Sequence, residues 1–318
     1  MSNSSTADSS SGSATKRKRH SFIIDFIIRL WKEKPLGMVG LVITLLLLLI
    51  AIFTNFISPY GMNECFVKDR LTAPSATYWL GTDDLGRDIL TRVIFGARIS
   101  VIVGLTSIAI ATVISTVIGL LCGYFGGKLD LVVQRFVDAV MCFPGLILMM
   151  VLITVIGPGI LQVIIVIGTL WGIIGSRIVR GATLSIKENM YVQAAVAIGC
   201  PTSRILIRHI LPNIMAPIII LFSTRVPNVI LTEASLSFLG FGIPPPDPSW
   251  GGMLSGSGRE YMFLAPWMVI WPGLALAVTV YGVNMFGDAV RDLLDPRLRG
   301  GLGRYGVRKP KKEAKKPW

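Results

Sequence analysis

The chain has 318 residues, a formal net charge of +13, 52% hydrophobic residues and only 15% charged residues. Soluble domains average about 25% charged residues, so this composition excludes an ordinary soluble protein and indicates an integral membrane protein. The basic residues are divided among loop ends and tails and do not form one groove-sized face. Membrane topology therefore explains the positive charge, and nucleic acid is not predicted as a partner.

The N-terminal region has two parts. Residues 1–20 are Ser-rich, lack apolar periodicity and end in a basic cluster, so we predict a disordered cytoplasmic tail. Residues 21–57 contain the first apolar run, from about Leu36 to Ile57. This run is longer than the apolar region of a signal peptide, and no small-residue cleavage pattern follows it. We therefore expect an uncleaved first span.

Six apolar runs are long enough to cross a bilayer, for which a helix needs about 20 predominantly apolar residues. They lie near residues 36–57, 99–121, 136–157, 160–179, 214–236 and 263–286. The fifth run contains Arg225, Pro227, Asn228 and Glu233, and a re-entrant or soluble segment is the alternative for it. The sequence predicts an all-α membrane protein with six transmembrane helices.

The segment 58–98 is predicted to be an extracytoplasmic loop that ends in an amphipathic helix. Its apolar residues recur on one helical face: Ile89, Leu90, Val93, Ile94 and Ala97. Asp88 and Arg92 are spaced as an i,i+4 pair on the other face, with the acid in the favourable N-terminal position. We expect this helix to lie at the outer membrane interface before the chain turns into the second span.

The distribution of basic residues predicts the orientation. Most of the 31 Lys and Arg residues fall before the first span, at 128–135, at 177–208 and after residue 290. Because basic residues are retained on the cytoplasmic side, both termini are predicted to be cytoplasmic. Residues 99–289 then form a five-helix core. Residues 290–318 form a basic cytoplasmic tail, which lies against anionic headgroups or free in solvent.

The sequence contains no motif for catalysis or metal binding. The nearest match to the phosphate-binding pattern GxxxxGK[ST] has Cys122 at the first Gly position and Leu129 at the hydroxyl position. The chain has only two His residues, and its four Cys residues form no CxxC pair. We therefore predict no catalytic residue, no cofactor and no metal site in this chain. An intramembrane enzyme is an alternative class for which the residues are missing.

One polar, basic stretch, YVQAAVAIGCPTSRILIRHILPN at 191–213, separates the fourth and fifth apolar runs. An Ala-rich helix from about residue 188 to 198 should end at Gly199, which suits the left-handed conformation past a helix end. Pro201 fits the first turn of a second short helix, which should end near Leu211 because the residue before Pro212 disfavours helix. Ile205, Leu206 and Ile210 form its apolar stripe. Two such helices make a rigid knob that can insert into a cytoplasmic partner; a plain connecting loop is the alternative.

This stretch resembles the EAA loop of binding-protein-dependent ABC importer permeases. That pattern is Glu-Ala-Ala, three residues, Gly, and a stretch ending in His-Ile-Leu-Pro-Asn. The resemblance implies that the segment 188–213 docks on ATPase subunits through the matching and neighbouring positions Tyr191, Gln193, Ala194, Ala195, Gly199, Pro201, Arg204, His209, Pro212 and Asn213. Gln193 stands where the family usually has Glu, so an ionic contact is replaced there by a hydrogen bond at most.

Further stretches resemble the second permease subunit of oligopeptide, dipeptide and nickel importers. They are WLGTDDLGRDILTRVIFGARIS at 79–100, GYFGGKLD at 123–130, EASLSFLGFG at 233–242, PSWGGML at 248–254 and GDAVRDLLDPRLR at 287–299. The resemblance implies the type I ABC importer permease fold in a bacterial or archaeal plasma (inner) membrane. It also implies three kinds of protein partner besides membrane lipid: a second permease subunit, two cytoplasmic ATPases that carry ATP and Mg, and an extracytoplasmic substrate-binding protein.

Two further sets of candidate residues follow. Contacts with the binding protein are expected from Asp83, Asp84, Arg87, Asp88 and Trp250, with a membrane-surface anchor as the alternative role of this region. Arg225, Asn228 and Glu233 are candidates for the translocation pathway or for the interface with the second permease, because charged groups within a span usually face an interior or a water-filled path.

The implied function is half of the pathway of an ATP-driven importer of dipeptides or oligopeptides. Within the same family, nickel or another small solute is the alternative. An ion-coupled secondary transporter is the alternative from another class, but the sequence shows neither internal repeats nor an acidic midplane cluster.

Overall fold

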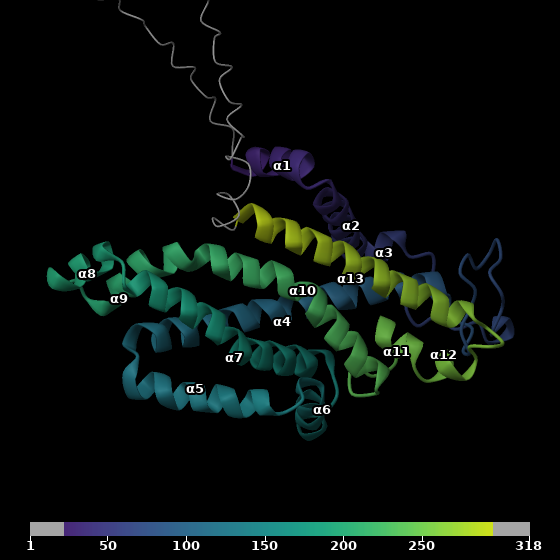
Figure 1. Ribbon diagram of the computed structural model, residues 1–318. Helices are drawn as coiled ribbons and strands as arrows, with labels where there is room; N and C mark the ends of the chain where they lie inside the picture. The colour runs from purple at the N-terminus through teal and green to yellow at the C-terminus, as the bar shows by residue number, and fades with distance from the viewer. Residues whose placement is uncertain (1–21, 295–318) are drawn as a thin grey trace, which may run out of the picture.

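The computed structural model describes residues 22–294 (Figure 1). The tail predicted at 1–20 and all but the first residues of the tail predicted at 290–318 lie outside the described residues. The described part is elongated, and its regular structure is helical throughout, with no β-strand in residues 22–294. This agrees with the predicted all-α class.

The helices follow one another as α1 Phe22–Glu33, α2 Pro35–Ile52, α3 Thr54–Ile57, η1 Val67–Asp69, α4 Ile89–Phe125, α5 Gly127–Cys142, α6 Gly145–Ile156, α7 Ile160–Lys187, α8 Met190–Ala197, α9 Thr202–Arg204, η2 Ile205–Ile210, η3 Leu211–Ile214, α10 Met215–Phe238, α11 Trp250–Leu254, α12 Ser257–Glu260 and α13 Trp267–Leu294. Among residues 22–294, five stretches are long and apolar enough to cross a membrane, namely α2, α4, α7, α13 and the run from Thr202 to Phe238 that includes α10. The bent pair of α5 and α6 makes a sixth if it is counted as one span.

The predicted third span, 136–157, is wrong as a single straight helix. The chain there forms two helices, α5 and α6, which meet at an angle of 95°. Phe143 has an extended backbone with φ −87° and ψ 141°, because the ring of Pro144 disfavours helical geometry in the residue before it. In Figure 1, α5 runs beneath α7 and α6 turns away sharply at its end.

The predicted separate amphipathic helix at the outer interface is also wrong. Helix α4 runs for 37 residues without a turn between the outer loop and the second span. Its apolar residues Ile89, Ile94 and Ala97 are buried within the protein. They therefore pack against other helices and do not anchor a separate helix to the membrane surface.

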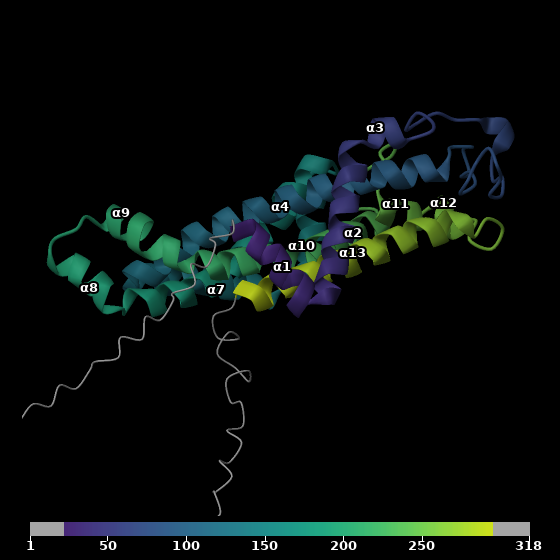
Figure 2. The ribbon, with the colours of Figure 1, turned by 90° about the horizontal axis from the view of Figure 1, so that it is seen from above.

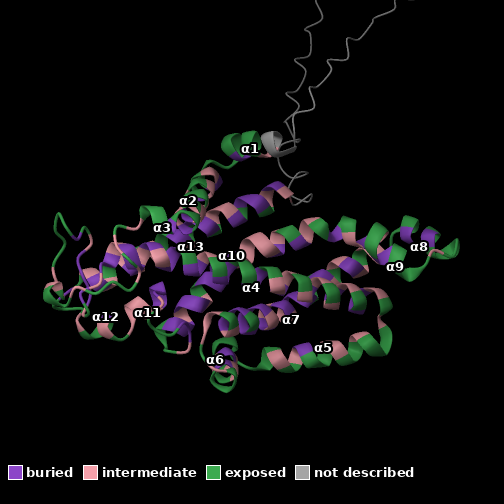
Figure 3. Ribbon diagram, turned by 180° about the vertical axis from the view of Figure 1, so that it is seen from behind, coloured by how far each residue is buried: buried purple, intermediate pink, exposed green. Residues whose placement is uncertain are grey.

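The core is built on close packing of α4 against α7, aided by small residues. On α4, Gly119 and Gly123 lie against Val179 and Thr183 of α7. On α7, Gly168 and Gly172 lie against Ile110 and Ile114 of α4. Glycine lets two backbones approach closely, which is the usual way for helices to associate in lipid, where apolar side chains gain little from contact alone. Figure 3 shows the buried residues concentrated where α4, α7, α10 and α13 face one another.

The N-terminal helices are attached to the C-terminal helix. Gly40 of α2 lies against the backbone of α13, and Lys34 forms a 2.5 Å ion pair with Asp292. The view in Figure 2 shows α2 crossing beside α13, while the loop 58–88 lies at the far end near α11 and α12. The two ends of the bundle are thus structurally distinct, with α8 and α9 at one and this loop at the other.

Candidate functional site

The segment 188–213 forms a compact projection at one end of the bundle. Helix α8 ends at Ala197, and Gly199, the first residue past the C-cap Ile198, has a φ of +78°. The Cys200 amide donates to the Ala195 carbonyl and the Gly199 amide donates to the Val196 carbonyl, both at 3.0 Å. This pair of bonds is a Schellman motif, which a glycine in the left-handed conformation permits. The predicted helix end at Gly199 is confirmed.

The projection has a small apolar core of its own. Val192 and Ala195 of α8 are buried against the predicted stripe of Ile205, Leu206 and Ile210, and Val179 of α7 closes the cluster. These contacts hold α8 against the start of the next helix. The stripe that the sequence predicted therefore faces inward, and it fixes the geometry of the projection.

The outer face of the projection is apolar and exposed. Met190 is 86% exposed and Ile198 is 81% exposed. The residues predicted to couple to a partner are mostly on this outer side: Tyr191, Gln193, Ala194, Gly199, Pro201, Arg204, Pro212 and Asn213 are exposed, whereas Ala195 is buried and His209 is half-buried. Gln193 donates a 3.1 Å hydrogen bond to the Glu188 carbonyl, so its amide braces the start of α8.

The second helix of the projection was predicted to end near Leu211, and this prediction is wrong. Pro201 precedes the helix with an extended ψ of 142° and lies just before its first turn. The chain then passes through a π-helical stretch at Ile205–Ile210 and a 3₁₀ turn at Leu211–Ile214 and continues directly into α10. Such irregular turns absorb a proline, which lacks the N–H that an α-helix requires. Pro212 therefore distorts the helix without stopping it.

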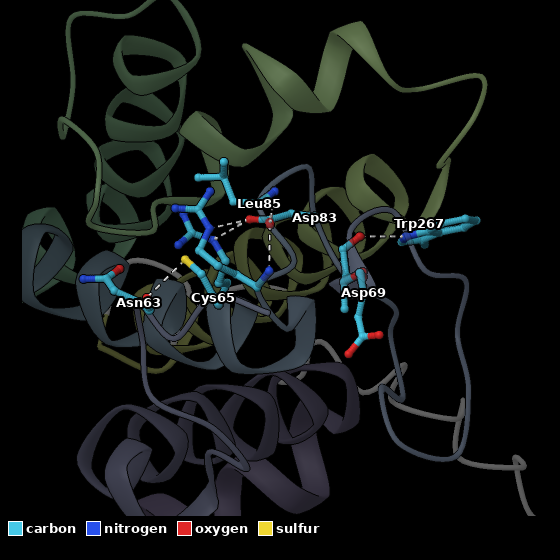
Figure 4. Close-up of polar contacts among 9 residues, drawn as sticks. Asn63, Cys65, Asp69, Asp83, Leu85 and Trp267 are labelled. Carbon is cyan, nitrogen blue, oxygen red and sulfur yellow. Dashed lines mark hydrogen bonds and ion pairs between the residues drawn. The ribbon is translucent and has the colours of Figure 1, made fainter. Parts of the chain in front are cut away.

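The opposite end of the bundle carries a hydrogen-bonded loop centred on Asp83 (Figure 4). Asp83 Oδ1 accepts hydrogen bonds from the Leu85 and Arg87 amides, both at 2.9 Å. Its Oδ2 accepts from Arg87 Nε at 2.6 Å. Both oxygens of Asp83 are engaged within the loop, so the prediction that Asp83 is a free contact for a binding protein is wrong, and its role is to hold the loop.

The same loop is fixed by Asp69 and by two aromatic side chains. The Tyr78 hydroxyl donates to Asp69 Oδ2 at 2.9 Å, and Trp267 Nε1 donates to the Thr82 carbonyl at 3.1 Å. Burial of the phenol and its hydrogen bond to Asp69 raise the pKa of Tyr78 to about 12. Figure 4 shows Trp267 reaching this loop from the C-terminal helix.

The predicted Asp88–Arg92 pair does not form. Asp88 caps helix α4: its Oδ2 accepts from the Thr91 amide and hydroxyl, both at 2.7 Å. Arg92 instead lies 3.7 Å from Asp83, measured from Nε to Oδ2. Both side chains are buried, so Asp88 is a capping residue and is not free to contact a binding protein.

Trp250 is likewise an internal residue. It is 2% exposed, and its Nε1 donates a 3.0 Å hydrogen bond to the Val93 carbonyl of α4. Its ring lies against Gly96, where a Cβ would collide with it. The predicted contact of Trp250 with a binding protein is wrong. Among the five residues predicted for that role, Asp84 and Arg87 keep partial exposure.

Arg225 and Asn228 both lie on α10, and Arg225 lines a cavity of about 670 Å³ between α7 and α10. The guanidinium of Arg225 lies over the Trp171 ring, 4.9 Å from its centroid, and Nη1 donates to the Trp171 carbonyl at 3.3 Å. A cation over an aromatic face is stabilised where water is scarce. Asn228 is exposed, and its amide donates to the Thr224 carbonyl.

Glu233 does not reach the pathway or a subunit interface. It is fully buried inside the chain, and its Oε1 accepts a 2.8 Å hydrogen bond from Ser237. Its Oε2 has no hydrogen-bond partner. Glu233 lies two turns from Arg225, and within the described part of the chain Arg225 contacts Trp171 whereas Glu233 contacts Ser237. The two charges of α10 therefore have separate surroundings.

A family model described as "Binding-protein-dependent transport system inner membrane component" matches residues 115–300, which is more than half of the chain. The chain belongs to this family. A second model, the N-terminal transmembrane domain of oligopeptide transport permease C, matches residues 21–74. The protein is therefore a multi-pass inner-membrane permease subunit of a binding-protein-dependent ABC importer.

Characterised relatives cover most of this permease. The dipeptide transport system permease protein DppC of Alkalihalophilus pseudofirmus is 40% identical over 84% of this chain and 88% of its own. The glutathione transport system permease protein GsiD of Pectobacterium atrosepticum is 41% identical over 80% and 85%. The oligopeptide transport system permease protein OppC of Bacillus subtilis is 38% identical over 92% and 96%.

Sequence reasoning missed two ion pairs that hold the permease's bent third span. Arg180 of α7 binds Asp130 of α5, and Arg177 of α7 contacts Asp138 of α5. The available signal was the spacing of the charges: Arg177 and Arg180 lie three residues apart, and Asp130 and Asp138 lie eight apart. These spacings separate the members of each set by about 60° and about 80° around a helix, so each set lies on one broad side of its helix. What the sequence did not show is that α5 lies alongside α7.

Proposed function

We propose that this chain forms half of the translocation pathway of an ATP-driven importer of dipeptides or oligopeptides. A second, homologous permease completes the pathway. Two cytoplasmic ATPases bind the projection at 188–213 and carry ATP and Mg, and an extracytoplasmic binding protein delivers the substrate to the end that holds the Asp83 loop. Both termini are cytoplasmic.

The observation that carries this proposal is the exposed apolar face of the projection. A solvent-facing knob with Met190 and Ile198 more than four-fifths exposed is costly unless another protein covers it. The knob is held rigidly by its own core of Val192, Ala195 and Ile205. It can therefore transmit a push from a bound partner without deforming.

The mechanism follows from the continuity of the helices. The start of the projection is joined to α7 through the short turn at 188–189, and its end runs into α10 without a break. When the two ATPases bind ATP and close against each other, they would move the projection and, with it, α7 and α10. The two permease halves would then rock between outward-facing and inward-facing states, a rigid-body transition of a common kind.

The peptide substrate is supported by the relatives, whose names describe transport of dipeptides, oligopeptides and glutathione. These three substrates share a peptide backbone. Uptake of a labelled dipeptide into cells that carry the complete transporter tests the class. Uptake of nickel ions with no uptake of peptide would instead support the other branch of the family.

Arg225 is proposed to face the pathway or the second permease, since it lines the 670 Å³ cavity between α7 and α10. Its stacking on Trp171 keeps the cation in place. Arg225→Gln should lower uptake, because the positive charge is lost. Arg225→Lys should preserve part of the uptake, because it retains the charge without the planar guanidinium. Uptake that is unchanged in Arg225→Gln would exclude both roles.

The coupling role is tested by copurification from native membranes in mild detergent. Replacing Met190 or Ile198 with Asp should release the ATPases, because a charge would be placed in an apolar contact. Phe263→Asp is the matched control: Phe263 is 93% exposed but lies at the opposite end of the bundle. ATPases that remain bound to Met190→Asp and Ile198→Asp, or that are released equally by Phe263→Asp, would contradict the proposal.

A further inference from the structure

A second cavity lies at the outer end of the permease, away from the projection. It has a volume of about 320 Å³ and is formed between the start of α4, the loop 239–249 and the turn before α12. This volume is at the lower end of the range of about 300–1,000 Å³ for small-ligand pockets. Its charged lining consists of two basic and two acidic side chains, Arg87, Arg92, Asp83 and Asp247.

Arg92 is the unusual member of this lining. Its side chain is only 8% exposed, and its Nη1 has no hydrogen-bond partner. Leaving a buried charged donor unpaired costs more than leaving a neutral donor unpaired, and such groups normally have a partner. Arg92 also lies in the first turn of α4, where the helix dipole adds to its positive potential.

Within residues 22–294, no carboxylate accepts a hydrogen bond from Nη1, although Asp83 forms an ion pair with Nε of Arg92. Asp83 already accepts three hydrogen bonds from the Leu85 amide and from Arg87, and its contact with Arg92 is at 3.7 Å, beyond hydrogen-bonding distance. Asp88 is engaged as the cap of α4. Asp84 attracts Arg92 electrostatically, but its Oδ1 is buried without a hydrogen bond. Within residues 22–294, Asp247 has no ion pair.

We infer that this cavity is a binding site for a carboxylate, which the guanidinium of Arg92 recognises. A guanidinium offers parallel N–H donors that match the two oxygens of a carboxylate. Asp247 opposes such a ligand, because it places a like charge in the same cavity. The lining thus contains two groups that attract a carboxylate, Arg87 and Arg92, and two that repel it, Asp83 and Asp247. Arg87 and Asp83 are bound to one another, so Arg92 and Asp247 are the two positions to test, and they make opposite predictions.

The carboxylate has two sources that fit this position, both at the outer end of the permease. One is the free C-terminal carboxylate of a transported peptide, and the other is an acidic side chain of the binding protein. Both sources rest on the proposed function, whereas the carboxylate site itself does not. The tests below therefore measure binding first, without transport, and determine the source afterwards.

The first test is ligand-observed NMR on the complete transporter in nanodiscs, with N-acetylglycine as the probe and neutral N-acetylglycinamide as its control. The acid should bind and the amide should not. Arg92→Gln should weaken binding of the acid by about tenfold or more, as loss of a charge-assisted hydrogen bond implies. Asp247→Asn should strengthen it. Arg98→Gln, at an exposed position of the same helix, should change nothing.

Opposite effects of Arg92→Gln and Asp247→Asn cannot both arise from damage to the fold. Arg92→Lys retains the charge without the planar fork and should give an intermediate affinity. Two results would overturn the inference. One is equal binding of the acid and the amide. The other is equal binding of the acid by the wild-type protein and by Arg92→Gln, provided that both proteins copurify with their partners.

The second test identifies the source. If the carboxylate belongs to the binding protein, Arg92→Gln should raise about tenfold the concentration of binding protein that half-activates ATP hydrolysis. If it belongs to the peptide, that concentration should stay constant while peptide uptake falls. If Arg92→Gln changes neither the half-activating concentration of binding protein nor the peptide uptake, the inference is overturned. Binding of N-acetylglycine by a protein that transports no peptide would contradict the proposed function alone.

Discussion

The guanidinium of Arg180 on α7 donates two parallel hydrogen bonds, each 2.5 Å long, to the carboxylate of Asp130, which lies 50 residues earlier on α5. Both side chains are mostly buried, with 31% and 16% exposure. This pair fixes the first half of the bent span to the core helix. Asp130 lies just after the turn from α4 into α5, which is made by Gly126 and Gly127, both with positive φ.

We expect Asp130→Ala to destabilise the permease by about 1–3 kcal/mol, because Arg180 would remain partly buried without its acceptor. Heat-induced loss of the folded fraction in detergent measures this. Arg135→Ala is the control, since Arg135 is 75% exposed and lies 3.4 Å from Asp138, and such pairs contribute about 0–1 kcal/mol. The loss of stability in the double variant Asp130→Ala, Arg180→Ala should be smaller than the sum of the losses in the two single variants. A loss equal to that sum would show that the pair does not interact.

Trp250 should be sensitive to a conservative change. Trp250→Phe removes the hydrogen bond to the Val93 carbonyl and leaves space beside Gly96, so we expect a loss of about 1–3 kcal/mol of stability. Trp79 is 71% exposed and provides the matched control, because Trp79→Phe should change stability by less than about 0.5 kcal/mol. The two thermal unfolding curves decide the matter, and coinciding curves would refute the internal role of Trp250.

Gly199→Val should reduce transport while ATP hydrolysis continues. A side chain at φ +78° is strained by about 1–2 kcal/mol even though the space around Gly199 is open, and the strain would tilt α8 relative to the next helix. The ratio of peptide uptake to ATP hydrolysis measures this coupling. Gly181→Ala, in open space within α7 and without positive φ, should leave the ratio intact; an unchanged ratio in Gly199→Val would count against the coupling role.

The outer loop should lose stability at high pH through Tyr78. Its pKa is raised to about 12 in the folded loop, whereas an unfolded phenol has a pKa of about 10. Between these values the unfolded loop has lost the proton and the folded loop keeps it, so the stabilisation is complete below pH of about 10 and decreases as pH rises toward about 12. The ultraviolet difference titration of wild type minus Tyr78→Phe should have its midpoint near the upper value; a midpoint near the lower one would exclude this burial.

The sequence determined the class of the protein and much of the coupling segment. Apolar runs of sufficient length can only be satisfied as helices in lipid. Gly199 marked its helix end because the left-handed conformation there is a local property of the chain. The stripe of Ile205, Leu206 and Ile210 was readable for the same reason, since it depends only on spacing along one helix. Pro144 was a local signal too, but the apolar composition around it concealed the break.

Only the tertiary structure decided which polar residues are exposed. Asp83, Asp88, Trp250 and Glu233 appeared available for a partner, yet each is buried in the folded chain. Arg92 was paired with Asp88 by spacing, but the cap of α4 took that carboxylate. That cap is a local contact with Thr91, which competes with the i,i+4 pair. Burial, in contrast, depends on what the fold brings from elsewhere, which spacing along one helix does not contain. The same long-range packing created the outer cavity and set the α5 helix beside α7.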